Sequence, residues 1–228
     1  MFVFSKKNLN NFKNKSRLIM YYGFFIVFAL FLYSCKTMKF SSLKNGDLIF
    51  VQSNEKQLSG AISRVTKDSK ETSYDHIGII KKRKNAISVY HATAQGGSKI
   101  ESLNSFLKNV HNDVKIDIFR LKKEHQKAIP HALEKASQML GKPYNFTYIL
   151  SDSSYYCSDF IERIFREHQI FELKPMTFKN PETGEIDVYW NEFYQKQGLE
   201  APEGKLGCNP NGLSMSDKIE FVLTLQNP

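Results

Sequence analysis

The period of the hydrophobic pattern changes near residue 130, and this change constrains the fold more than any other feature of the chain. Before it, short β-branched runs such as 86–93 alternate apolar and polar side chains, as half-buried strands do. After it, apolar residues recur at helical spacing over 130–141. Strands followed by helices predict an α+β domain with an antiparallel sheet packed against helices.

The same patterns predict the individual elements. We expect strands over 46–51, 76–80, 86–93, 114–118 and 219–225, and helices over 57–66, 102–108, 130–141 and 157–168. The stretch 171–212 is long, aromatic and proline-rich without clear periodicity. Such a stretch is typical of a functional covering flap rather than of core.

Residues 1–34 have the layout of a secretory signal peptide. Five basic residues and no acidic one accompany an apolar run from Leu18 to Tyr33. This run is shorter than the roughly 20 residues that span a bilayer. Its Leu-Tyr-Ser-Cys ending resembles a bacterial lipobox, so we expect residues 1–34 to be a lipoprotein signal peptide, Cys35 to be lipidated and residues 35–44 to be a tether. An uncleaved anchor is the alternative, and either one places the rest of the chain in the cell envelope, outside the cytoplasm.

The charge of the chain does not indicate nucleic-acid binding. The formal net charge is +9, but five of the 32 basic residues lie in the signal segment, which leaves 27 against 23 acidic residues. No repeated basic and aromatic pattern accompanies them. Residues 45–228 are enough for one domain with a sizeable core.

Cys157 lies at the start of a predicted amphipathic helix. The positive end of the helix dipole and unpaired backbone N–H groups stabilise a thiolate there and predict a lowered pKa. Cys157 shares a helical stripe with Phe160 and Ile164, so its sulfur should face inward. Outside the cytoplasm a disulfide between Cys157 and Cys208 is an alternative. However, Cys208 lies in a loop rich in Gly, Pro and Asn, and a single bridge is a weak framework.

A cysteine nucleophile needs a base, and the base needs an orienting group. His76 begins one predicted strand and His91 lies near the end of the next, so an antiparallel hairpin makes them neighbours. The other four histidines lie in predicted turns or on polar helix faces, where a solvated surface residue is the simpler interpretation. We therefore predict that Cys157, His76 and His91 form one site.

Five short motifs resemble the circularly permuted NlpC-type papain-like proteins, specifically the YiiX-like group. They are Asn45-Gly46-Asp47-Leu48-Ile49-Phe50, Tyr74-Asp75-His76-Ile77-Gly78-Ile79, Val89-Tyr90-His91-Ala92, Gly141-Lys142-Pro143-Tyr144 and Tyr156-Cys157-Ser158-Asp159. The resemblance covers about residues 43–225. It implies a permuted papain-like fold in which the Cys157 helix packs against the sheet.

Carried over to this chain, the resemblance implies that Cys157 is the nucleophile, His76 the base and His91 the orienting group. Many YiiX-like proteins have a glutamate in the third role, so Glu101 and Asp75 are alternatives. Tyr156 lines the pocket or packs beside it. No cofactor is implied, and without CxxC or HExxH spacing no metal site is predicted.

The expected chemistry is acyl transfer, in which the Cys157 backbone N–H meets the oxyanion. We expect a cysteine hydrolase of the cell envelope that cleaves an amide bond in a peptide-like substrate, such as a cell-wall peptide. The permuted group also includes lipid acyl hydrolases and acyltransferases with the same order of His, His and Cys, which gives a second hypothesis. A binding module without catalysis is the third.

Overall fold

The computed structural model describes residues 40–54, 56–66, 72–84, 86–110 and 114–226. The chain divides into two compact units, Met1–Leu43 and Lys44–Pro228, and the second holds the sheet and the site. The predicted signal peptide and the lipidation site at Cys35 lie outside the described residues. Among the helices that are described, none is long and apolar enough to cross a membrane.

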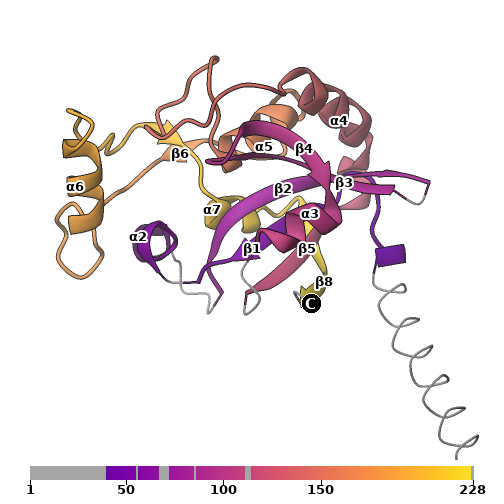
Figure 1. Cartoon of the computed structure of the whole chain (residues 1–228), viewed down its shortest axis with the longest axis horizontal. Coiled ribbons are helices and arrows are strands. Elements are labelled where there is room, and N and C mark those ends of the chain that lie inside the picture. Colours follow the sequence, from indigo (N-terminus) through magenta and orange to yellow (C-terminus); the bar gives the residue numbers. More distant parts are fainter. Residues whose placement is uncertain (1–39, 55, 67–71, 85, 111–113, 227–228) are drawn as a thin grey trace, which may run out of the picture. The chain divides into compact units, whose positions relative to one another are not determined.

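A six-stranded antiparallel sheet forms the centre of the second unit (Figure 1). Its strands are β1 Leu48–Gln52, β2 Tyr74–Arg83, β3 Ala86–Thr93, β4 Gly97–Ser102, β5 Lys115–Leu121 and β8 Ile219–Gln226, in the order β4-β3-β2-β1-β5-β8. A second, two-stranded sheet pairs β6 Lys174–Pro175 with β7 Leu206–Gly207. The predicted α+β class with an antiparallel sheet is confirmed.

The helices are α2 Gln57–Thr66, α3 Leu103–Lys108, α4 Ile129–Gln138, α5 Cys157–Phe165, α6 Val188–Gln195 and α7 Pro210–Ser214, with 3-10 turns at Lys123–Ala128 and Arg166–His168. Helix α5 packs on β2 and β3, and α4 packs on α5. The apolar stripe of α5, with Phe160 and Ile164, is buried against strand residues such as Ile77 and Ile79. The Cys157 helix therefore lies against the sheet, as the resemblance implied.

Two elements differ from the sequence prediction. Strand β2 runs from Tyr74 to Arg83 and is therefore longer at both ends than the predicted strand over 76–80. The segment Gly97–Ser102 forms β4, for which no strand was predicted. Two consecutive glycines with positive φ, Gly96 at 116° and Gly97 at 67°, make the turn between β3 and β4. This strand extends the sheet beyond the predicted histidine hairpin.

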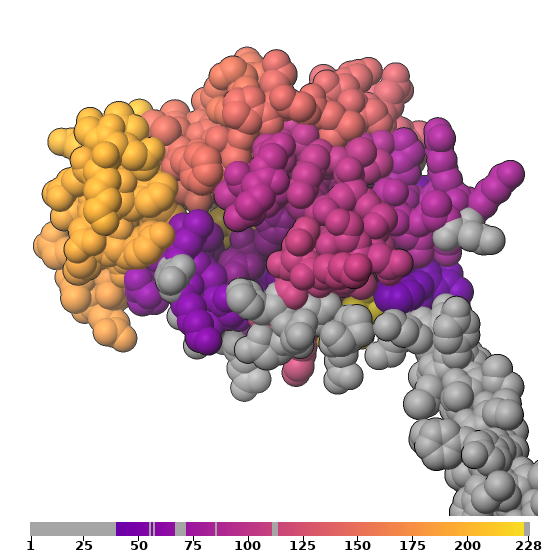
Figure 2. Space-filling model, viewed as in Figure 1, coloured from indigo at the N-terminus to yellow at the C-terminus, as the bar shows by residue number. Residues whose placement is uncertain are grey.

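The stretch 171–212 holds regular structure as well as loops. Helix α6 lies beside α2, as the orange and indigo surfaces in Figure 2 show. Arg64 of α2 binds Asp187, the N-cap of α6, at 2.9 Å, and the indole N–H of Trp190 donates to the Ala61 carbonyl at 3.3 Å. These contacts fix the stretch to the body of the domain.

Candidate active site

Cys157 is the first residue of α5, and only 6% of it is exposed. Its Sγ–H points to the backbone carbonyl of Asp75 at 3.9 Å, and the backbone N–H groups of Ser158 and Ile77 lower the pKa of the thiol. Asp75 and Ile77 flank His76 in β2. The sulfur therefore lies beside the strand segment that carries the predicted base.

The pKa of Cys157 corrects the sequence expectation. Burial, followed by the nearby Asp75 carboxylate, raises the pKa of the thiol to about 12. The two backbone amides and the Tyr144 hydroxyl act in the opposite direction, but they do not overcome burial. The position at a helix N-terminus alone therefore gives the wrong sign, and the resting group is a thiol.

His76, His91 and Glu101 form a hydrogen-bonded chain. Nε2 of His76 lies 2.8 Å from Nδ1 of His91, and Nε2 of His91 lies 2.9 Å from Glu101 Oε1. Ser105 Oγ donates to the other Glu101 oxygen at 2.8 Å, and Lys99 Nζ approaches the carboxylate at 3.4 Å. Glu101 thus contacts His91 and not His76, so it stands behind His91 rather than in its place.

Strand register produces this chain. Ile79 pairs with Tyr90 and Val89 pairs with Glu101, which places the three polar residues on one sheet face. His76 and His91 lie at diagonal positions across β2 and β3, and His91 and Glu101 lie at diagonal positions across β3 and β4. Long side chains can reach one another over this distance. The missed strand β4 therefore carries the third member of the chain.

The hydrogen-bond acceptors in this set of three residues fix the tautomers of His76 and His91. A carboxylate only accepts hydrogen bonds, so His91 donates from Nε2 to Glu101 and its Nδ1 is an acceptor. His76 must then donate from Nε2, which leaves the lone pair of His76 on Nδ1. The arrangement therefore presents one defined basic nitrogen.

Both imidazoles are neutral in the folded protein. Burial lowers the pKa of His76 to about 3, and the neighbouring His91 adds to the effect. Burial and the Lys99 charge lower the pKa of His91 to about 3. Phe106 of α3 packs against both rings, with centroids 6.0 Å from His76 and 5.2 Å from His91. This aromatic contact excludes water from one side of the pair.

Cys157 and the imidazoles open onto two cavities. One, of about 600 Å³, includes Cys157 and flap residues such as Met176 and Trp190. The other, of about 450 Å³, is lined by His76, His91 and Glu101. Asp75 lines both. Within the part of the chain that the structure describes, no hydrogen bond joins the Cys157 sulfur to an imidazole, so the structure places them near one strand segment without a direct bond.

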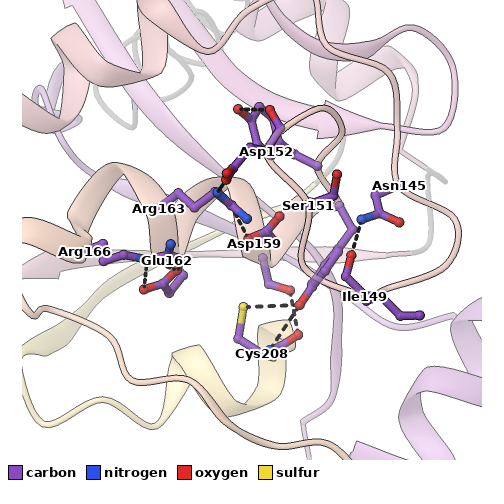
Figure 3. A network of polar contacts seen from close by, with 12 residues as sticks. Asn145, Ile149, Ser151, Asp152, Asp159, Glu162, Arg163, Arg166 and Cys208 are labelled. Atoms are coloured by element: carbon purple, nitrogen blue, oxygen red, sulfur yellow. Dashed lines mark hydrogen bonds and ion pairs between the residues drawn. The ribbon is translucent and has the colours of Figure 1, made fainter. Parts of the chain in front are cut away.

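Tyr156 packs in the core and holds the Cys208 loop. Its hydroxyl accepts the Cys208 backbone N–H at 3.2 Å, and Ser158 Oγ donates to the Cys208 carbonyl at 3.1 Å. Figure 3 shows these contacts at Cys208. Cys208 and Cys157 are both free and buried, so the alternative disulfide is not formed. Tyr156 also lines the larger cavity, so it both packs in the core and borders the pocket.

Asp159 completes the motif around Cys157 as a structural residue. Its Oδ1 accepts a hydrogen bond from Arg163 at 2.6 Å, and Arg163 also binds Asp152 at 2.6 Å (Figure 3). Burial raises the pKa of Asp159 to about 6. The network ties the first turns of α5 to the loop before it and thereby fixes where the helix begins.

Tyr144 is a site residue that sequence reasoning did not assign a role. It is the last residue of Gly141-Lys142-Pro143-Tyr144, one of the resembling motifs, and it lines the larger cavity. Its hydroxyl lowers the pKa of the Cys157 thiol, against the larger effect of burial.

A family model described as permuted papain-like amidase enzyme, YaeF/YiiX, C92 family, matches residues 42–223. Among curated proteins, none matches the sequence. One similar solved structure is the crystal structure of metalloprotein yiiX from Escherichia coli O157:H7, with a TM-score of 0.62 and 23% identity. The similarity covers 79% of this chain and 96% of that one. At this identity the likeness shows the fold.

Proposed function

We propose, since the chain belongs to the YaeF/YiiX (C92) family of permuted papain-like amidases, that it hydrolyses a peptide-like amide bond through an acyl-enzyme on Cys157. His76 is the base, and His91 with Glu101 holds it in one tautomer. The observation that carries this proposal is the hydrogen-bonded chain from His76 to Glu101, beside the strand segment whose backbone contacts the Cys157 sulfur.

The reaction begins from the neutral thiol and neutral imidazole. His76 takes the thiol proton at Nδ1 as the sulfur attacks the amide carbon, and the electrons of the carbonyl double bond move to its oxygen. Collapse of the tetrahedral intermediate breaks the C–N bond, and His76 gives the proton to the leaving amine. Water then attacks the thioester with His76 again as base, which releases the acid and restores the thiol.

Glu101 stabilises the positive charge that develops on the imidazoles during proton transfer. A lone second imidazole fixes the ring of His76 but carries no negative charge of its own. Glu101 supplies that charge through His91 at 2.9 Å. We therefore regard His91 and Glu101 together as the orienting group.

The donor set does not fit a metal ion. The related structure is titled a metalloprotein. Here both ring nitrogens of His91 are engaged, by His76 and Glu101. No group of three or more His, Cys, Asp or Glu residues suited to a metal occurs within the described ranges.

A lipid acyl group is the second candidate substrate, and the shape of the larger cavity favours it. The cavity joins Cys157 to apolar flap residues including Met176, Phe178 and Trp190. Such a pocket accepts an acyl chain as readily as an apolar peptide side chain. The lipobox-like sequence at Cys35 supports a cell-envelope location, in which both substrate classes occur.

Selective alkylation tests the site without knowledge of the substrate. We expect iodoacetamide to modify Cys157 at least about tenfold faster than Cys208, because only Cys157 has a base that removes the thiol proton. Mass spectrometry of tryptic peptides measures both rates in one sample. His76→Gln should lower the Cys157 rate to that of Cys208, whereas Cys208→Ala should leave the Cys157 rate unchanged. Equal and slow labelling of both cysteines in the wild type would count against the proposal.

The substrate class needs a second assay. Muropeptides and phospholipid vesicles are incubated with wild type and Cys157→Ala, and the products are separated by chromatography. Release of an amine from the muropeptides by wild type alone supports the amidase. Release of fatty acid alone favours the lipid hypothesis.

A further inference from the structure

The Tyr148 hydroxyl is buried without a hydrogen-bond partner. Only 8% of the residue is exposed, and its ring packs between Tyr156 and Trp190 at centroid distances of 5.4 and 5.5 Å. Its oxygen forms no hydrogen bond with any residue that the structure describes. A buried hydroxyl without a partner destabilises the fold, so this position calls for another explanation.

The backbone at Tyr148 is strained in a way that places this side chain. Its φ is +55°, in the left-handed region that bulky residues rarely adopt. Asn145 enforces the conformation: its side-chain amide donates to the Ile149 carbonyl at 2.6 Å, and its oxygen accepts the Thr147 backbone N–H at 3.0 Å (Figure 3 shows the first of these). Tyr194 adds a hydrogen bond to the Thr147 carbonyl at 3.0 Å. Strain held by several contacts is characteristic of functional positions.

Tyr148 lines the same cavity as Cys157. Cys157 also contributes to the raised pKa of the Tyr148 hydroxyl. The Tyr144 hydroxyl is a neighbour as well, although the two hydroxyls do not have the geometry of a hydrogen bond. Tyr148 thus offers, in the cavity of the nucleophile, a hydroxyl donor without a hydrogen-bond partner among the described residues.

We propose that Tyr148 is a catalytic residue whose hydroxyl donates a hydrogen bond to the substrate carbonyl oxygen as Cys157 attacks. The inference rests on the proposed function of Cys157. The sulfur–carbon bond forms, the carbonyl electrons move to oxygen, and the oxyanion accepts the hydrogen bond without taking the proton. When the intermediate collapses, the carbonyl re-forms and Tyr148 is unchanged.

Burial favours the donor form of this residue. Desolvation is the largest influence on the Tyr148 hydroxyl and raises its pKa above the usual range. The group therefore stays protonated over the range in which an amidase works. A donor that is held in place before the reaction needs no reorganisation energy as the charge develops. This is the condition for effective oxyanion stabilisation.

Two reactions of the same thiol separate this role from packing. Acylation by p-nitrophenyl acetate passes through an oxyanion, whereas alkylation by iodoacetamide occurs at a saturated carbon and does not. For Tyr148→Phe we expect acylation of Cys157 to slow by about 10²- to 10³-fold, which is the usual loss for one oxyanion donor. Alkylation of Cys157 should stay within about twofold of wild type. Release of p-nitrophenolate and mass spectrometry measure the two rates.

Tyr155→Phe is the matched control, because Tyr155 is also buried but bonds the Asp152 carbonyl and does not line the cavity. Its two rates should equal those of wild type. Thermal unfolding of Tyr148→Phe should occur at or above the wild-type temperature, since an unpartnered hydroxyl is removed. Acylation reduced less than about tenfold, or reduced in proportion to alkylation, would overturn the role of Tyr148. If wild type shows neither acylation nor alkylation of Cys157, the proposed function itself fails.

Discussion

Replacing His76 and His91 together by glutamine should remove a large part of the acid sensitivity of folding. Both imidazoles have a pKa of about 3 in the folded protein, against an ordinary value of 6.5. Burial thus favours their neutral forms. Because the folded-state pKa is lowered, the associated stability is intact above about pH 6.5 and is lost as the pH falls toward 3.

The magnitude follows from proton linkage. Below pH 6.5 the unfolded chain binds protons that the folded pair does not, so each histidine lowers the free energy of unfolding by about 1.4 kcal/mol per pH unit. At pH 5 the loss is about 2 kcal/mol for each histidine and about 4 kcal/mol for the pair. Glutamine does not titrate. The double variant should therefore lose about 4 kcal/mol less than wild type between about pH 8 and pH 5.

Urea unfolding at the two pH values measures this difference. Trp190 is the single tryptophan and is 2% exposed, so its fluorescence reports unfolding without further labelling. Asp159, whose pKa is raised to about 6, titrates in both proteins, so its contribution cancels when the losses are compared. If wild type and the double variant lose the same free energy within about 1 kcal/mol, the imidazoles titrate normally when folded, and the lowered pKa of the pair is wrong.

Three further substitutions test the arrangement around the site. Glu101→Gln should lower kcat at least about tenfold with little change in KM, because the developing imidazolium loses its countercharge; an unchanged steady-state kcat would contradict this role. Asp47→Asn should lower the free energy of unfolding by about 3 kcal/mol or more in urea titrations, since the fully buried Asp47 carboxylate accepts two hydrogen bonds from Arg120 at 2.7 and 2.8 Å. Gly97→Ala should destabilise more than Gly184→Ala in the same titrations: both have positive φ, but a Cβ at Gly97 would lie 2.0 Å from a backbone carbonyl oxygen and one at Gly184 meets open space.

The local hydrophobic periodicity was sufficient to predict most of the helices and strands of the main sheet. Helix α2 and strand β3 begin and end at the predicted residues, because their amphipathic patterns are set by the same burial that forms them. Strand β4 was missed because its polar residues, Lys99 and Glu101, lie on the face that carries the histidines, where no apolar alternation is needed. The Gly96-Gly97 pair was the available signal, since two such residues often form a tight hairpin turn.

The site was predictable in part for a similar reason. The contact between His76 and His91 follows from hairpin geometry, which connects residues near in sequence. The place of Glu101 behind His91 depends on the register of a third strand, and the position of Tyr148 depends on a positive φ that no local pattern specifies. The pKa of Cys157 was predicted with the wrong sign, because the sequence reveals a helix N-terminus but not how deeply the sulfur is buried.

The neutral resting state determines where charge must be accommodated during the reaction. With the pKa of Cys157 raised to about 12 and that of His76 lowered to about 3, an ion pair of thiolate and imidazolium is disfavoured in the free protein. The proton therefore leaves the sulfur only as the carbon–sulfur bond forms, and the negative charge passes directly to the carbonyl oxygen. The transition state then needs a countercharge behind the imidazoles and a donor beside the oxygen at the same moment. Glu101 is positioned for the first requirement and Tyr148 for the second, so the two residues should affect acylation together and alkylation of the thiol differently: Glu101→Gln slows both reactions, and Tyr148→Phe slows only acylation.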